Sequence, residues 1–137
     1  MVKRNKPQSV YIPKLDAEHG TIRQAAEDLH QALAAGGEKG DVRAVVHVLM
    51  QQINAHFASE ERMMRSSAYP SYDWHKRQHD TMRKRMQECE GRADVGDHAR
   101  VSELLEFFEA WLGDHTGLHD RMMSAYLRNF EREQRAS

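Results

Sequence analysis

Cysteine is almost absent from this sequence, which holds one such residue, Cys89, among 137. A single cysteine excludes a disulfide within the chain and cannot anchor a metal cluster that needs several thiolates. Its scarcity suits a reducing compartment. We expect Cys89 to be a packing residue late in a helix.

An excess of charge of one sign is also lacking, because 20 basic and 21 acidic residues leave a formal net charge of −1. The two signs are interspersed, so there is no basic patch of the kind that binds nucleic acid or phospholipid surfaces. Hydrophobic runs are a few residues long, far short of the roughly 20 that span a membrane. Lys3, Arg4 and Lys6 are not followed by the apolar run of a signal peptide. We therefore expect a soluble, cytoplasmic protein that binds neither nucleic acid nor membranes; the sequence indicates no protein partner.

Proline and glycine are few, and they divide a chain that otherwise shows helical spacing of hydrophobic residues. Pro7 and Pro13 disfavour helix in residues 1–12, which we expect to form an extended arm. Asp41 is a suitable N-cap and Pro70 suits a first helical turn. Helices are predicted over residues 13–35, 41–66, 70–91, and from about 97 through 111 and beyond.

One globular domain spanning residues 1–137 fits this length and its 39% hydrophobic content. Four helices with short links predict an all-α fold, an up-down-up-down four-helix bundle that follows the N-terminal arm. A short C-terminal helix of a turn or two, from Met122 to Phe130, is expected to pack across one end of the bundle.

Seven side chains that commonly bind metal ions fall into four groups, one group in each predicted helix. Positions four apart on a helix lie within about 40° of each other, so both can reach one ion. A single such pair is weak evidence, because the same spacing is common on solvated helix faces. The groups are His19; His56 with Glu60; His75 with His79; and His115 with Asp120.

The candidate histidines lie on the apolar sides of their helices. Leu15 and Ile22 share a face with His19, and Ile53 shares a face with His56. An unpaired imidazole in a core costs free energy, which a bound metal ion would offset. The four groups would therefore point inward together.

Five imidazoles and two carboxylates suit Fe, Mn or Zn better than Ca or Mg, which prefer all-oxygen ligands. The donor set alone leaves iron and zinc open. Because the two carboxylates come from different helices, we expect each to bridge two metal ions, with the imidazoles as terminal ligands. The sequence thus predicts two metal ions close together.

The candidate ligands lie within longer motifs. These are Asp16-x-x-His19-x-x-Ile22, the run from His56 to Met64, Tyr69-Pro70, His75-x-x-x-His79, and Trp111-Leu112-x-x-His115-x-x-x-x-Asp120. Together they resemble the hemerythrin family, in particular its single-domain bacteriohemerythrins. The resemblance extends from about residue 11 to about residue 127.

The resemblance implies a di-iron centre that binds dioxygen reversibly. It implies one iron with three terminal histidines and a second with two, the latter keeping an open position for dioxygen. Two carboxylates and a hydroxide or oxide would bridge the irons. Carried onto this sequence, the ligands are His75, His79 and His115 on one iron, His19 and His56 on the other, and Glu60 and Asp120 as bridges.

Apolar residues near the ligands would form a pocket for dioxygen. Such a pocket slows the loss of reduced oxygen species and resists autoxidation of the iron. The candidates are Trp111, Phe108, Ile22, Ile53 and Met63.

The spacing between His115 and Asp120 departs from the helical pattern. Five residues of a regular helix turn through about 140° beyond one full turn, too far for both to share a site. We therefore expect a π-like turn, with Gly117 as the place where it forms. Thr116 stands where the family usually has isoleucine, and His119, four residues after His115, is a rival ligand to Asp120.

The other histidines have weaker claims. His47 lies nine residues before His56, about 180° round the helix, and should face solvent. His30 lies about 16 Å from His19 along the helix axis, too far for one site. His98 falls near a helix start, and we interpret all three as structural or exposed.

The favoured function is reversible dioxygen binding for storage, delivery or sensing, without catalysis. The alternative is a di-iron redox enzyme that acts on dioxygen, peroxide or nitric oxide. Ferritin-like di-iron enzymes carry Glu-x-x-His on each of two helices, whereas only Glu27 with His30 has that spacing here. A third hypothesis, a helical interaction module with zinc or no metal, would be settled by metal analysis.

Overall fold

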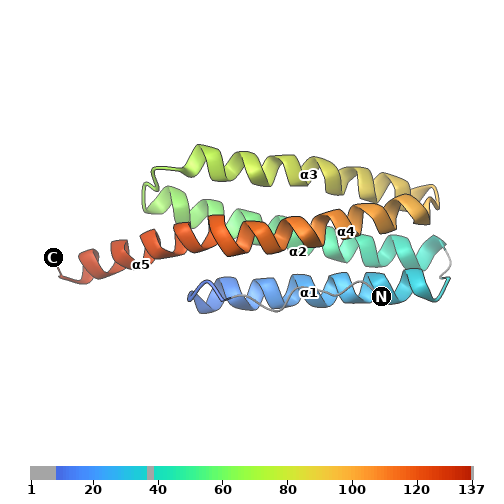
Figure 1. Ribbon diagram of the computed structural model, residues 1–137, viewed down its shortest axis with the longest axis horizontal. Coiled ribbons are helices and arrows are strands. Elements are labelled where there is room, and N and C mark those ends of the chain that lie inside the picture. Colours follow the sequence, from blue (N-terminus) through green and yellow to red (C-terminus); the bar gives the residue numbers. More distant parts are fainter. Residues whose placement is uncertain (1–8, 37–38, 137) are drawn as a thin grey trace.

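The structure is a computed structural model, and it describes residues 9–36 and 39–136. Within that part of the chain it contains helices and no strands (Figure 1). The helices are α1 (Pro13–Ala34), α2 (Lys39–Ser66), α3 (Tyr72–Asp94), α4 (His98–Asp114), the π-helix η1 (His115–Asp120) and α5 (Arg121–Ala136).

Helices α1 to α4 form the predicted up-down-up-down bundle. Figure 1 shows them running alternately in opposite directions, with short links at the two ends. Helix α1 packs on α2, α2 on α3, α3 on α4, and α4 also contacts α1, which closes the bundle. No helix in the described part is both long and apolar enough to cross a membrane.

Local sequence signals account for the helix ends. Pro13 occupies the start of α1, where its missing N–H is not needed and its fixed φ suits a helix. Gly36 follows α1 with φ +63° and Gly96 follows α3 with φ +77°, a left-handed conformation that costs glycine little. The Asp97 side chain caps α4 by accepting a hydrogen bond from the Arg100 backbone N–H at 3.2 Å.

Some boundaries differ from the prediction. Helix α2 begins at Lys39, so Asp41 lies in its first turn, and α3 begins at Tyr72, so Pro70 precedes it. Of the predicted N-terminal arm, residues 9–12 are described and are not helical; residues 1–8 lie outside the described part.

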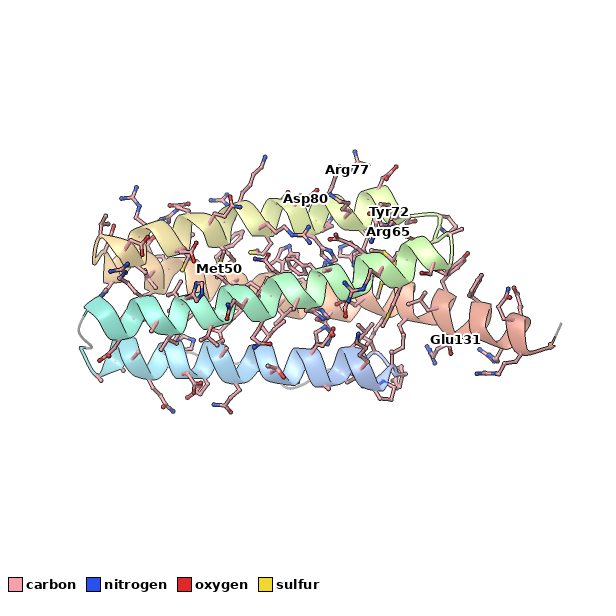
Figure 2. All side chains as sticks on the ribbon, turned by 180° about the vertical axis from the view of Figure 1, so that it is seen from behind. Met50, Arg65, Tyr72, Arg77, Asp80 and Glu131 are labelled. Atoms are coloured by element: carbon pink, nitrogen blue, oxygen red, sulfur yellow. The ribbon has the colours of Figure 1, made fainter. Side chains whose placement is uncertain are left out.

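Helix α5 is longer than the expected turn or two, since it covers 16 residues. Its first turns pack on the end of the bundle, where Met123 and Leu127 are buried, and its remainder projects beyond (Figures 1 and 2). Residues 131–136 are exposed and four of the six are charged, with Glu131 and Arg135 3.9 Å apart one turn from each other. Such residues are good helix formers, so the helix continues without a core to pack on.

Two hydrophobic clusters fill the bundle, and the candidate ligands lie between them. Along the chain, each group of ligands is flanked by one residue of the larger cluster and one of the smaller. These flanking pairs are Ile22 and Leu15, Ile53 and Met64, Met82 and Tyr69, and Leu112 and Met123, with the residue of the larger cluster first. The polar side chains therefore form one buried layer with apolar packing on both sides.

Candidate metal centre

All seven candidate ligands meet in this buried layer. Their exposed fractions lie between 0% and 2%. Their donor atoms form two groups that share the two carboxylates, and within each group the atoms lie within 4.8 Å of one another. One group is Glu60, His75, His79, His115 and Asp120, and the other is His19, His56, Glu60 and Asp120.

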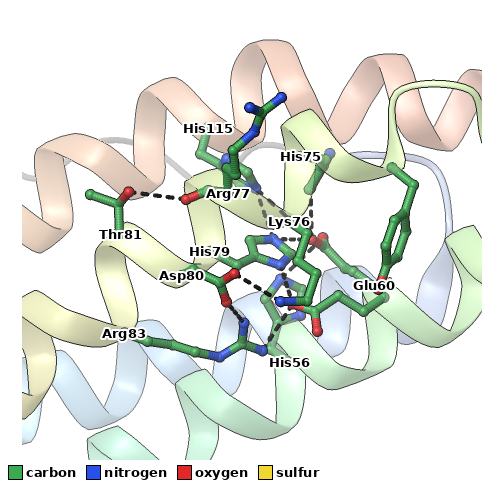
Figure 3. A network of polar contacts seen from close by, with 12 residues as sticks. His56, Glu60, His75, Lys76, Arg77, His79, Asp80, Thr81, Arg83 and His115 are labelled. Atoms are coloured by element: carbon green, nitrogen blue, oxygen red, sulfur yellow. Dashed lines mark hydrogen bonds and ion pairs between the residues drawn. The ribbon is translucent and has the colours of Figure 1, made fainter.

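Glu60 divides its two oxygen atoms between these groups (Figure 3). Its Oε1 lies 3.2 Å from His75 Nε2 and 3.0 Å from His79 Nε2. Its Oε2 lies 3.2 Å from His56 Nε2. One carboxylate thus faces both sets of histidines.

Asp120 divides its oxygen atoms in the same way from the opposite side of the bundle. Its Oδ1 lies 3.1 Å from His75 Nε2 and 2.9 Å from His115 Nε2. Its Oδ2 lies 3.4 Å from His19 Nε2. The carboxylates therefore define two adjacent positions, one with three histidines and one with two.

These distances fit two metal ions. Ligand atoms about 3 Å apart are what metal–ligand bonds of about 2.1 Å at right angles produce. Several of the inward-facing atoms are buried and have no hydrogen-bond partner among the described residues, an arrangement that is costly without a bound cation. These atoms are His19 Nε2, His56 Nε2, Glu60 Oε2 and both Asp120 oxygens.

Two further carboxylates hold the outer nitrogen atoms of ligand rings. Glu18 Oε1 lies 2.8 Å from His56 Nδ1, and Glu61 Oε2 lies 2.8 Å from His79 Nδ1. In each case the carboxylate comes from the preceding helix. A carboxylate at Nδ1 fixes the tautomer that directs Nε2 to a metal ion and makes the ring a stronger ligand.

The electrostatics of the layer also favour cations. Burial alone would lower the pKa of His56, but the charge of Glu60, 3.2 Å away, and the hydrogen bond that Glu18 accepts from His56 Nδ1 raise it to about 10. Burial likewise opposes the raised pKa of His75, which contacts with Asp120 and Glu60 bring to about 9. Burial and Glu60 would raise the pKa of Asp120, yet the surrounding histidines hold it well below its usual range. Metal ions would take the place of the protons that these imidazoles attract.

The π-helix brings Asp120 to the same side of the chain as His115. Residues 115–120 form the π-helical turn expected from the five-residue spacing, and it contains Gly117. The wider turn offsets the rotation that would separate the two side chains in an α-helix. His119 belongs to neither donor group. Its ring lies edge-on to Trp74 at a centroid distance of 4.4 Å.

Aromatic rings cover two of the three histidines in the larger group. The Phe57 ring stacks on His79 at a centroid distance of 4.0 Å and an angle of 6°. The Trp111 ring stacks on His115 at 4.4 Å and 13°, and the two aromatic rings meet edge-on at 5.8 Å. Together they form an apolar wall along one side of the layer.

The predicted pocket residues divide between the two clusters. Ile22, Ile53 and Phe108 are buried in the larger cluster, and Trp111 packs against it. Met63 packs with the smaller cluster and lines a surface groove of about 460 Å³ between the start of α1, α2 and α5. The structure therefore brings four of the five together and sets Met63 apart.

The remaining histidines lie away from this layer. His47 is exposed, with Nδ1 3.5 Å from Glu90 Oε2, and His98 is the first residue of α4. His30 is half-buried and contacts Glu109 across the interface between α1 and α4.

Sequence reasoning missed Glu18, Glu61 and Phe57. The available signal was their position, because each directly precedes or follows a candidate ligand in the sequence. That position does not identify the histidines that they contact, because each of the three contacts a histidine on another helix.

Comparison with known families gives a match over most of the chain. A family profile described as the hemerythrin HHE cation binding domain matches residues 10–127. The bacteriohemerythrin of Aquifex aeolicus (strain VF5) is 30% identical over 123 residues, which cover 88% of this chain and 92% of that protein. The bacteriohemerythrin of Stenotrophomonas maltophilia (strain R551-3) is 29% identical over 129 residues, covering 91% and 83%.

Solved structures show the same arrangement of helices. A crystal structure of a hemerythrin mutant superimposes with a TM-score of 0.80 and 23% sequence identity. The match covers 93% of this chain and 96% of that one. At this identity, the likeness supports the fold.

Proposed function

This chain belongs to the hemerythrin family, and from this premise we propose that it binds dioxygen reversibly at two iron ions. Family membership and the buried histidine and carboxylate cluster make it a non-haem di-iron oxygen-binding protein. The proposal adds reversibility, a ligand assignment, and a role in oxygen storage, delivery or sensing.

The observation that carries the ligand assignment is the division of oxygen atoms by Glu60 and Asp120. Each carboxylate faces three-histidine and two-histidine groups with different oxygen atoms. Under the proposal both are bridging ligands, together with a hydroxide or oxide. His75, His79 and His115 are then terminal ligands of one iron, and His19 and His56 are those of the other.

The unequal number of histidines provides the place for dioxygen. His75, His79 and His115 would supply three imidazoles to one iron, whereas His19 and His56 would supply two to the other and so leave a position for dioxygen. Iron in its ferrous form would supply the reversible exchange of electrons with dioxygen that amino-acid side chains cannot provide.

The surrounding side chains prepare the site. Glu18 and Glu61 hold the Nδ1 atoms of His56 and His79 and so orient these rings before a metal ion arrives. The Phe57 and Trp111 rings restrict access of water to His79 and His115. Under the proposal, the oriented rings favour metal binding and the apolar cover slows autoxidation of the iron.

A binding role fits the donor set better than a catalytic one. Hemerythrins are oxygen-binding proteins rather than enzymes, and the relatives found here are bacteriohemerythrins. The cluster contains five imidazoles, which carry no charge as metal ligands, and only two carboxylates. Carboxylate-rich sites stabilise the highly oxidised iron that oxidising enzymes need. In this site imidazoles outnumber carboxylates, which favours binding over oxidation.

Metal analysis tests the assignment. We expect two irons per chain after anaerobic loading with ferrous iron, and fewer in the variant His56→Leu. His47→Leu is a matched control, because His47 lies on the same helix but is exposed and outside the cluster. Zinc in preference to iron, or equal iron in both variants, would contradict the proposal.

A further inference from the structure

Arg83 lies on α3 one turn after His79, and it contacts both groups that hold the His79 ring. Its Nη2 lies 2.9 Å from Glu61 Oε2. The same oxygen accepts the hydrogen bond from His79 Nδ1. The guanidinium carbon lies 5.2 Å from the centroid of the Phe57 ring, which stacks on His79. Arg83 thus contacts both side chains that hold the His79 ring, Glu61 and Phe57.

The arginine is itself held in place. Its Nη1 lies 2.7 Å from Asp80 Oδ1, and Asp80 Oδ2 accepts from Lys76 Nζ at 2.8 Å (Figure 3). The guanidinium therefore joins a carboxylate of α2 to one of α3. Arginine suits this role, because its planar fork serves two acceptors at once while its face lies on an aromatic ring.

Support for the two-histidine group is looser. Glu18, which holds His56, has an exposed side-chain fraction of 25%, against 9% for Glu61. Its nearest cation is Lys14, with Nζ 3.9 Å away, and its other strong contact is the Ser59 hydroxyl at 2.8 Å. The two metal positions thus differ in how firmly a histidine ligand is fixed.

We propose that Arg83 is a positioning residue of the metal centre, holding Glu61 and Phe57 on the His79 ring and thereby slowing release of the three-histidine metal ion. This inference rests on the proposed function, since it concerns one of the two irons. Arg83 does not touch the metal positions; it acts through His79. Loss of a group that hydrogen-bonds a ligand directly, as Glu61 does, typically weakens metal binding about 10- to 100-fold, and Arg83 acts through that group.

The test is release of iron from protein loaded anaerobically with ferrous iron, mixed with excess of a ferrous chelator that becomes coloured on binding. We expect the unaltered protein to release its irons in two phases. Arg83→Met should speed one phase about 10- to 100-fold and leave the other near its original rate. Arg83→Lys, which keeps the charge but not the planar fork, should release this iron at a rate between those of the unaltered protein and Arg83→Met.

Arg85→Met is the matched control. Arg85 lies on the same helix and also covers an aromatic ring, with its guanidinium carbon 5.2 Å from the Phe107 centroid. Phe107 is 47% exposed and stacks on no candidate ligand. This variant should release both irons at the original rates. Glu61→Gln combined with Arg83→Met should speed release little more than either change alone, because both act through His79.

The outcomes separate the two claims. Unchanged release from Arg83→Met, or equal acceleration of both phases, would overturn the positioning role while leaving the proposed function intact. Failure of the unaltered protein to hold iron would overturn the proposed function and this inference with it. If circular dichroism shows that Arg83→Met does not fold, Arg83→Lys decides: one faster phase supports the inference, and original rates overturn it.

Discussion

The rings of Trp111 and His115 lie nearly parallel, 13° apart in angle, with their centroids separated by 4.4 Å. Trp111 also meets the edge of Phe57, the ring that stacks on His79. One indole therefore completes the apolar cover over two candidate ligands of the same metal ion. Its removal should be felt at the metal centre as well as in the core.

We predict that Trp111→Ala lowers the free energy of unfolding by about 3 kcal/mol, as is usual when a large aromatic ring leaves a core. It should also speed autoxidation of the iron, because water gains access to His115. Denaturant unfolding and the decay of the oxygenated spectrum measure the two effects. Trp74→Ala is the control: Trp74 is 40% exposed and packs on His119. Equal autoxidation rates in both variants would exclude a protective role for Trp111.

Asp120 and His119 give opposite expectations. Asp120→Asn should reduce the iron content below two per chain, because Asp120 belongs to both donor groups and an amide cannot replace its charge. His119→Ala should retain two irons, since His119 belongs to neither group. Iron analysis after anaerobic loading distinguishes them. If His119→Ala lost iron and Asp120→Asn kept it, the rival assignment would be correct.

The π-helix leads to a prediction about chain length. Deletion of Gly117 would place His115 and Asp120 four residues apart, the spacing at which an α-helix already puts both on one face. We expect the shortened protein to stay helical and to keep two irons. Insertion of an alanine after Gly117 should instead turn Asp120 away and reduce iron binding. Circular dichroism and metal analysis check both variants. If the deletion lost iron and the insertion kept it, the role given to the π-helix would be wrong.

Cys89 should be unreactive in the folded protein. It is fully buried, and burial, helped by the charges of Glu88 and Glu90, raises the pKa of its thiol to about 11. Since the thiolate is the reactive form, thiol reagents at pH 8 should leave Cys89 unmodified until the chain unfolds. Mass spectrometry after maleimide treatment, with and without denaturant, tests this. Rapid labelling of the native protein would show that the larger core cluster opens readily.

Much of the fold and the layer of ligands could be predicted because both depend on spacing within single helices. His75 and His79 share a face through their four-residue separation, and the five-residue separation of His115 and Asp120 required the π turn that is observed. These relations are properties of one helix and can be read from residue numbers.

Contacts between helices could not be predicted in this way. Glu18 holds His56 and Arg83 holds Glu61, and in both cases the partners lie on different helices. Such pairs depend on how neighbouring helices are rotated and shifted. The same reason explains Met63, which shares a helix face with His56 in sequence but packs with the other cluster.

The central claim is that this chain binds dioxygen reversibly at two irons, and the most direct measurement is the visible spectrum of the reduced, iron-loaded protein during cycles of dioxygen and argon. We expect two irons per chain and an absorption band that appears under dioxygen, fades under argon and returns over repeated cycles. Irreversible conversion to the diferric form in the first cycle would contradict reversible binding and favour redox chemistry, and absence of iron would contradict the whole account.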